Sequence, residues 1–167
     1  MKVIIHGITG KMGQIVYHAA QEAEDIEVAA GVDKHAPAED IGVSVYPNVS
    51  AVPAAADVII DFSVREALAG LLAGATAKKL PLVVATTGLT DQDRHMIFQA
   101  SEKIPVLQSA NFSIGINLMY ALARRAASAL GDDWDIEIIE KHHNQKKDAP
   151  SGTAYALADA INAAFNG

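Results

Sequence analysis

Apolar and polar residues alternate in blocks through the first two thirds of the chain. Short apolar runs occupy residues 2–6, 26–32, 57–62, 82–85 and 105–109, and such runs are typical of strands that are buried on both faces of a sheet. The segments between several of them have apolar residues three and four positions apart, which gathers those side chains on one face of a helix. This β-α repetition predicts an α/β fold with a parallel sheet, helices on both faces and ligands at the carboxyl ends of the strands.

Three helices are predicted among these strands. The first presents Met12, Ile15, Val16, Ala19, Ala20 and Ala23 on one side, and the second presents Val64, Ala67, Leu68, Leu71, Leu72 and Ala75. The third is expected to begin after Thr90 and to reach about residue 101, because Thr90 can cap it and Asp93 lies three positions further on. Residues 34–52 show no sustained period and are predicted to be mostly loop.

The pattern changes at Asn111, where we expect a second unit to begin. A polar turn at 111–113 precedes a long helix with Leu118, Met119, Leu122, Ala123, Ala126 and Leu130 on its apolar side. Residues 134–140 alternate in part and predict a strand, and the chain closes with a helix that carries Ala154, Leu157, Ala158, Ile161 and Phe165.

Composition narrows the functional class. The chain has 167 residues, half of them hydrophobic, with a net charge of -7 and an isoelectric point near 5.2. An acidic chain of this kind argues against a general nucleic-acid binder, which would present a broad basic face. It has no cysteine, no signal-peptide pattern and no apolar run near the roughly 20 residues that a membrane helix needs. We therefore expect a cytoplasmic enzyme domain with neither a nucleic-acid nor a membrane partner.

Three glycines mark the turn between the first strand and the first helix. Gly7, Gly10 and Gly13 form G-x-x-G-x-x-G, and such a turn can admit a pyrophosphate to a helix N-terminus. It departs from the stricter G-x-G-x-x-G, so a purely structural turn is the alternative. Asp33 follows the next strand and could accept hydrogen bonds from ribose hydroxyls, whereas Lys34 could neutralise a 2′-phosphate. The pair leaves both NADH and NADPH open.

Two further strand ends have a double interpretation. Residues 85–88, A-T-T-G, follow a predicted strand and could line the nicotinamide with backbone groups and two hydroxyls. Asn111 and Phe112 follow another predicted strand in the same way. Either segment could also be a plain connection.

Residues 140–154 read E-K-H-H-N-Q-K-K-D-A-P-S-G-T-A and contain a basic patch in an acidic chain. Adjacent histidines in an extended segment point to opposite faces, and the chain has neither cysteine nor H-E-x-x-H, so a metal site is disfavoured. Lys146 could act as a general acid and His143 could donate to a carboxylate. Ser151, Gly152 and Thr153 could cap the last helix or hold a substrate carboxylate. A surface loop with an ordinary helix cap is the alternative.

Five segments together resemble the dihydrodipicolinate reductases, also called 4-hydroxy-tetrahydrodipicolinate reductases, of the diaminopimelate and lysine pathway. They are residues 7–13, 61–63, 85–88, 109–115 and, above all, 140–154 with its H-H-x-x-K-x-D-A-P-S-G-T-A pattern. The resemblance implies hydride transfer from NADH or NADPH to the ring of a small cyclic dicarboxylate, with the proton from Lys146. It gives His142 an acid-base or positioning role, His143 a substrate contact, and Gly152 and Thr153 the grip on a carboxylate.

The resemblance also implies a fold and a set of cofactor contacts. The fold is a Rossmann-type doubly wound parallel sheet over 1–110, followed by the first part of an α+β substrate and oligomerisation domain over 111–167. The implied contacts are Gly7, Ile8, Thr9, Gly10, Lys11, Met12, Asp33, Lys34, Ala85, Thr86, Thr87, Ser109, Ala110, Asn111 and Phe112. Family members continue past residue 167, so we expect a chain that lacks the C-terminal part, either as a fragment or as a naturally short relative, and a homotetramer at full length. The alternatives are a truncated or non-catalytic NAD(P)-binding module and another Rossmann dehydrogenase.

Overall fold

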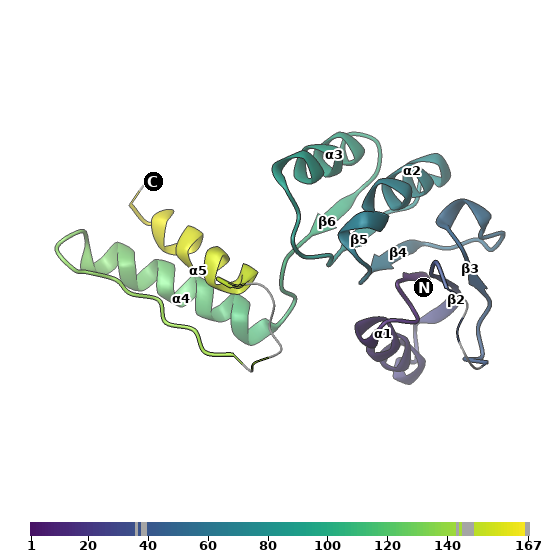
Figure 1. Ribbon diagram of the computed structural model, residues 1–167, viewed down its shortest axis with the longest axis horizontal. Coiled ribbons are helices and arrows are strands. Elements are labelled where there is room, and N and C mark those ends of the chain that lie inside the picture. Colours follow the sequence, from purple (N-terminus) through teal and green to yellow (C-terminus); the bar gives the residue numbers. More distant parts are fainter. Residues whose placement is uncertain (36, 38–39, 143, 145–148, 166–167) are drawn as a thin grey trace. The chain divides into compact units, whose positions relative to one another are not determined.

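The chain divides into two compact units, Met1–Ser109 and Ala110–Gly167, in a computed structural model (Figure 1). The structure describes residues 1–35, 37, 40–142, 144 and 149–165. The first unit combines a sheet with helices, and the second is built around two helices. Each unit is described by itself.

A six-stranded parallel sheet forms the first unit. Its strands are β1 (Lys2–His6), β2 (Glu27–Val32), β3 (Val45–Tyr46), β4 (Val58–Asp61), β5 (Leu82–Val84) and β6 (Val106–Gln108). They lie in the order β3-β2-β1-β4-β5-β6, and every neighbouring pair is parallel. This is the 3-2-1-4-5-6 order of a doubly wound sheet, in which ligands bind where the order reverses, beyond the ends of β1 and β4. The predicted fold class is confirmed.

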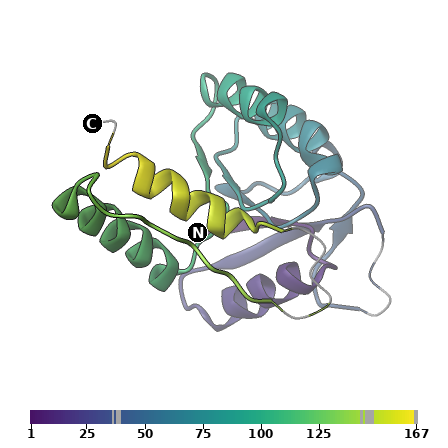
Figure 2. The same ribbon diagram turned by 60° about the vertical axis from the view of Figure 1, so that its left-hand side comes forward.

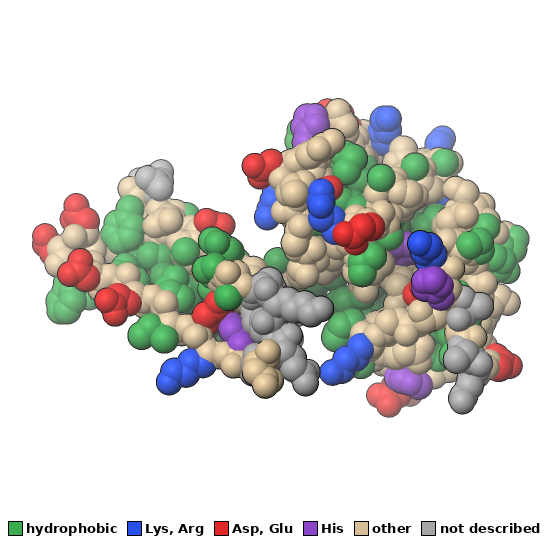
Figure 3. All heavy atoms as spheres, in the orientation of Figure 1, with side chains coloured by type: hydrophobic (Ala, Val, Ile, Leu, Met, Phe, Trp, Pro, Cys, Tyr) green, Lys and Arg blue, Asp and Glu red, His purple; other side chains and the backbone are tan. Residues whose placement is uncertain are grey.

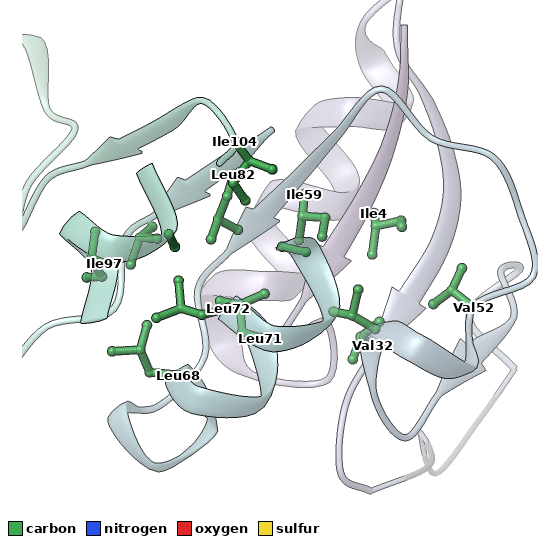
Figure 4. Packing of buried hydrophobic residues seen from close by; sticks show 14 of the residues in the cluster. Ile4, Val32, Val52, Ile59, Leu68, Leu71, Leu72, Leu82, Ile97 and Ile104 are labelled. Atoms are coloured by element: carbon green, nitrogen blue, oxygen red, sulfur yellow. The ribbon is translucent and has the colours of Figure 1, made fainter. Parts of the chain in front are cut away.

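Helices cover both faces of this sheet (Figure 2). Helix α1 (Lys11–Glu22) packs on one face, whereas α2 (Leu68–Lys78) and α3 (Asp91–Ser101) pack on the other. Successive side chains of a strand point to opposite faces, so β1 contributes to both cores. Val3 and Ile5 join the α1 side, and Ile4 joins the cluster around Leu71 and Leu72 of α2 (Figure 4).

Helix α3 begins as its sequence predicts. The Thr90 hydroxyl accepts the Asp93 amide at 3.3 Å, and the Asp93 carboxylate accepts the Thr90 amide at 2.8 Å. These reciprocal bonds form a capping box, which satisfies two amides that no helical carbonyl can reach. Arg65, in the short 3-10 helix η2 (Arg65–Ala67), donates from Nε to the same Asp93 carboxylate. The start of α3 is thereby tied to the segment that leads into α2.

Residues 34–52 were predicted to be mostly loop, and their described part is mostly loop with two short elements. These are β3 at Val45–Tyr46 and a 3-10 helix, η1, at Val49–Ala51. A two-residue strand is too short to show an alternation of period two, and it owes its place to pairing with Gly31 and Val32 of β2. Sheet pairing, which lies outside the local sequence, decides this element.

Two helices form the second unit, α4 (Ile114–Leu130) and α5 (Gly152–Asn162), and they pack against each other. Side chains of Ser113 and Ser151 cap their N-termini. The strand predicted over 134–140 is wrong, because that segment pairs with no strand in the described part of the chain. It runs instead beside α5, where Trp134, Ile136 and Ile138 line a hollow together with residues of that helix. A strand needs a partner for its backbone groups, and alternation alone does not supply one.

Large apolar side chains remain exposed on the second unit (Figure 3). The most exposed are Ile114, Ile139, Trp134, Tyr155, Leu122 and Leu118. The apolar side predicted for α4 is therefore correct as a pattern but is only partly covered in this chain. Among the described residues, no helix combines the length and the apolar character that a membrane crossing requires.

Candidate functional site

The glycine turn joins β1 to α1 through close backbone contacts. Gly7 has a φ of +81°, a conformation that favours glycine. Its amide donates to the Val32 carbonyl at 2.8 Å, and the Gly10 amide donates to the Gly7 carbonyl at 3.0 Å. A Cβ at Gly13 would lie 2.0 Å from that same carbonyl oxygen. The three glycines thus allow the first turn of α1 to lie in close contact with the end of β1. The first amides of the helix, which have no helical acceptor, are directed toward the glycine turn.

Asp33 closes one side of the turn at the end of β2. Its carboxylate accepts the Thr9 amide at 3.2 Å and the His35 amide at 3.3 Å. Burial raises the pKa of Asp33, but the hydrogen bonds from Thr9 and His35 outweigh it and hold the pKa below its ordinary value. The group is therefore an anion at neutral pH with acceptor capacity left for further donors. Lys34 beside it is exposed.

A polar network that the sequence interpretation missed lies under the turn. Asp61, the last residue of β4, is completely buried. It accepts hydrogen bonds from His6 Nδ1 at 2.7 Å, the Ser63 hydroxyl at 2.6 Å and the Thr86 hydroxyl at 2.7 Å. Burial raises the pKa of Asp61, and these donors more than offset it, so its pKa is lowered. The ionised carboxylate fixes three donors from β1 and from the segments that follow β4 and β5.

A cavity of about 590 Å³ opens above this network. Its lining comes from the glycine turn, the end of β2 and the segment after β4, and consists of His6, Gly7, Thr9, Gly10, Asp33, Lys34, His35, Phe62, Ser63, Val64, Glu66 and Ala67. The cavity lies where the strand order reverses, and its lining includes the N-cap residue of α1, Gly10, an anionic acceptor, Asp33, and an exposed lysine, Lys34. A dinucleotide fits this donor set: amides for phosphates and a carboxylate for ribose hydroxyls.

The other predicted cofactor residues differ in how far their side chains are exposed. Ile8 is completely buried in the core, whereas Lys11 and Met12 are exposed on the first turn of α1. Thr86 is buried and donates its hydroxyl to Asp61, so only Thr87 of the two threonines has an exposed side chain. Ala85 follows β5 and is half-buried.

The predicted segment 109–112 spans the boundary between the units. Ser109 continues from β6 and donates its amide to the Val84 carbonyl. Ala110, Asn111 and Phe112 belong to the second unit. Within that unit the Asn111 amide group donates to the Thr153 hydroxyl at 3.3 Å. Asn111 is thus attached to the first turn of α5.

The N-terminus of α5 carries the second part of the candidate site. Ser151 is buried, and its hydroxyl accepts the Ala154 amide at 3.1 Å, which caps the helix. Thr153 receives two hydrogen bonds, one from Asn111 and one from Tyr120, whose hydroxyl donates to the Thr153 carbonyl. Gly152 is exposed at the start of the helix. The backbone that would hold a carboxylate is therefore fixed by its own cap and by α4.

Glu140, at the end of the extended segment, connects this helix to His142. Its carboxylate accepts the Ser151 amide at 2.9 Å, the Ser151 hydroxyl at 2.6 Å and His142 Nε2 at 2.8 Å. The Ser151 hydroxyl, followed by His142, lowers the pKa of Glu140 to about 2. No role was predicted for Glu140, although it opens the motif.

Two predicted site residues, His143 and Lys146, lie outside the described residues, so their roles stay predictions. In the described part of the chain, no three histidine or carboxylate side chains gather in a way that could hold a metal ion.

Family comparison covers both units. Residues 1–112 match the family model for the dihydrodipicolinate reductase N-terminus, and residues 115–167 match the model for its C-terminus. The chain belongs to the dihydrodipicolinate reductase family. The chain is 49% identical over 162 residues to 4-hydroxy-tetrahydrodipicolinate reductase of Caldanaerobacter subterraneus subsp. tengcongensis, a match that covers 97% of this chain and 63% of the relative. The enzyme of the same name from Zymomonas mobilis is 43% identical and is matched over 61% of its length.

Solved structures agree with this family assignment. A dihydrodipicolinate reductase from Paenisporosarcina sp. TG-14 with bound dipicolinate has a TM-score of 0.77 at 31% identity, and the match covers 98% of this chain and 66% of that one. An oxidoreductase from Agrobacterium radiobacter in complex with NAD+ has a TM-score of 0.58 at 18% identity, over 76% of this chain and 41% of that chain, and shares the fold alone. The family reductases thus extend well beyond this chain, which spans under two thirds of their length.

Proposed function

We propose that the protein containing this chain reduces 4-hydroxy-tetrahydrodipicolinate with NADH or NADPH, the reaction for which its relatives are named. The first unit would bind the cofactor and the second the cyclic dicarboxylate. The observation that carries the proposal is the cavity at the strand-order switch, with the glycine turn and Asp33 around it, in a chain that matches both family models. The bound dipicolinate of the Paenisporosarcina enzyme supports a small cyclic dicarboxylate as substrate.

Cofactor binding would use the turn, Asp33 and Lys34. When bound, the nicotinamide group supplies the hydride. First-turn amides of α1 would receive the pyrophosphate, and Asp33 would accept the ribose hydroxyls with the oxygen capacity that Thr9 and His35 leave. Lys34 is exposed beside Asp33 and can attract a 2′-phosphate. This pairing favours use of both cofactors.

Substrate binding and proton transfer would use the motif of the second unit. Gly152 and Thr153 would hold a carboxylate at the start of α5, where amides without helical partners attract an anion. Lys146 would donate the proton and His143 would contact the substrate. His142 would take the acid-base or positioning role and is held by Glu140.

A reductase assay with freshly prepared substrate and NADH tests the proton donor. Lys146→Ala is expected to lower kcat by about 10²-fold or more, as loss of a positioned general acid does. Lys141→Ala is the matched control, because it removes the same charge from an exposed side chain of the same motif. Equal activity of the two variants would remove the role from Lys146.

Calorimetry separates the enzyme from a non-catalytic NAD(P)-binding module. The protein is titrated with NADH and then with pyridine-2,6-dicarboxylate. A reductase binds both ligands, whereas a module binds NADH alone. Sedimentation of the full-length protein tests the predicted homotetramer.

A further inference from the structure

Glu140, the first residue of the motif in the second unit, is a hydrogen-bond acceptor shared by Ser151 and His142. It receives three hydrogen bonds, two from Ser151 and one from His142, all between 2.6 and 2.9 Å. Glu140 and His142 are two positions apart in the sequence, and their side chains contact each other directly through the bond from Nε2 to Oε2. The Glu140 side chain is half-buried, with 25% of its surface exposed, whereas that of His142 is exposed at 36%.

Capping of α5 alone does not account for this arrangement. The Ser151 hydroxyl already caps the helix by accepting the Ala154 amide. A carboxylate that served only the helix would need no histidine. Here the same oxygen, Oε2, accepts both the Ser151 hydroxyl and His142 Nε2, so the ring is fixed relative to the first residues of α5.

The chemistry of the acceptor determines the protonation pattern of the ring. An ionised carboxylate can only accept hydrogen bonds, so His142 Nε2 must carry a hydrogen. When the ring is neutral, its lone pair is then on Nδ1. The lowered pKa of Glu140 supports the ionised form at neutral pH.

We propose that Glu140 is a positioning residue that fixes His142 as its Nε2–H tautomer and holds that ring to the N-terminus of α5, so that Nδ1 is the nitrogen left to accept a proton or a hydrogen bond. The consequence for catalysis rests on the proposed function, in which His142 serves the reaction and the start of α5 binds the substrate. The tautomer itself does not depend on that function.

Nitrogen-15 NMR of the histidine-labelled 167-residue chain tests the tautomer at a pH where the ring is neutral. The His142 signals are assigned by their loss in His142→Asn. We expect a protonated Nε2 and an unprotonated Nδ1. Glu140→Gln is expected to give a mixture of tautomers, because an amide offers a donor as well as an acceptor. A neutral ring with its proton on Nδ1, or a tautomer unchanged in Glu140→Gln, overturns the proposal.

Kinetics of the full-length protein test the consequence. Glu140→Gln should lower kcat by about tenfold or more, a share of the 10²- to 10⁴-fold that a positioned acid or base contributes. Glu140→Asp keeps the charge and should recover part of the loss. Glu137→Gln is the matched control, because it makes the same chemical change at an exposed position of the same segment. Equal kcat values for Glu140→Gln and Glu137→Gln would refute the positioning role.

The NMR experiment and the kinetic experiment test the Glu140 arrangement and the proposed reaction separately. An inactive wild-type protein with the expected His142 tautomer would reject the proposed reaction and retain the Glu140 arrangement. An active protein whose tautomer ignores Glu140 would do the reverse.

Discussion

Replacement of Gly13 by alanine should damage the first unit at its cofactor turn. Gly13 is the third residue of α1, and a Cβ there would lie 2.0 Å from the Gly7 carbonyl oxygen and 2.7 Å from Ile8 Cα. Real Cβ contacts essentially never fall below 3.0 Å, so the two segments must separate by about 1 Å. Both obstacles are backbone atoms, and neither can rotate away. Ile8 is completely buried, and the Gly7 carbonyl already accepts the Gly10 amide.

The magnitude follows from two opposed contributions. Alanine in place of glycine inside a helix stabilises by about 0.5–1 kcal/mol. Overpacking costs about 1–3 kcal/mol, and we take the upper end because backbone must move. The net effect on the free energy of unfolding is a loss of about 2 kcal/mol. At about 4 °C per kcal/mol for a unit of this size, Tm should fall by about 8 °C.

Gly70→Ala is the matched control. Gly70 also lies in the first turn of a helix, α2, but a Cβ there would meet nothing within 4 Å. It should stabilise by about 0.5–1 kcal/mol, so the two alanine variants should differ by about 3 kcal/mol. Urea unfolding followed by far-UV circular dichroism measures this difference. Trp134, the only tryptophan, lies in the second unit, so its fluorescence reports that unit instead.

Cofactor affinity gives an independent measurement. A shift of about 1 Å in the turn moves the first-turn amides of α1, and misplacement of that size can cost about 10²-fold in a positioned interaction. NADH titration should therefore show weaker binding for Gly13→Ala than for Gly70→Ala. If Gly13→Ala were as stable as Gly70→Ala and bound NADH equally well, the close approach of turn and helix would not be the reason for glycine at position 13.

Three further changes probe the first unit. Asp61→Asn should lower the free energy of unfolding by about 1–3 kcal/mol in urea titrations, because an amide hydrogen would face buried donors such as His6. Thr90→Ala removes a helix cap and should cost about 1 kcal/mol, whereas Thr87→Ala at an exposed side chain should leave stability unchanged. Hydrogen bonds from Arg65 and Thr90 lower the pKa of Asp93 to about 2, below its unfolded value, so its contribution is present above about pH 4 and lost as pH falls toward 2. Urea midpoints over that range should depend less on pH in Asp93→Asn than in the wild type.

Local patterns were sufficient for most elements of the first unit. Apolar runs marked five of its six strands, and the Thr90–Asp93 spacing marked the start of α3. Strand β3 gave no such signal, because two residues cannot show a period. The alternation at 134–140 gave a false signal, since a strand also needs a partner with matching register. The predictions of secondary structure failed where the pairing of one strand with another, rather than the local sequence pattern, decides the structure.

The same distinction separates the predicted from the missed site residues. The glycine turn and Asp33 could be predicted because they belong to a local motif with known spacing. His6 and Asp61 are 55 positions apart and meet because β1 and β4 pair in a register that places them opposite each other. The sequence contained one clue: each is a titratable residue that directly follows three apolar residues at the carboxyl end of its strand.

Asp61 and Glu140 share a role: each carboxylate accepts hydrogen bonds from several donors of a candidate site. Asp61 accepts four hydrogen bonds and Glu140 accepts three, and each carboxylate has a histidine among its donors and lies beside a segment expected to bind ligand. Segments rich in amides, hydroxyls and imidazoles have a surplus of donors, and buried donors require acceptors. A carboxylate is the acceptor of highest capacity. Within the basic motif, roles were predicted only for cationic side chains and hydrogen-bond donors. None was predicted for Glu140, although it is the first residue of the motif. A motif that gathers hydrogen-bond donors for an anionic ligand therefore also needs an acceptor that orients those donors before the ligand binds. The nearest carboxylate in the sequence is the first candidate for that acceptor.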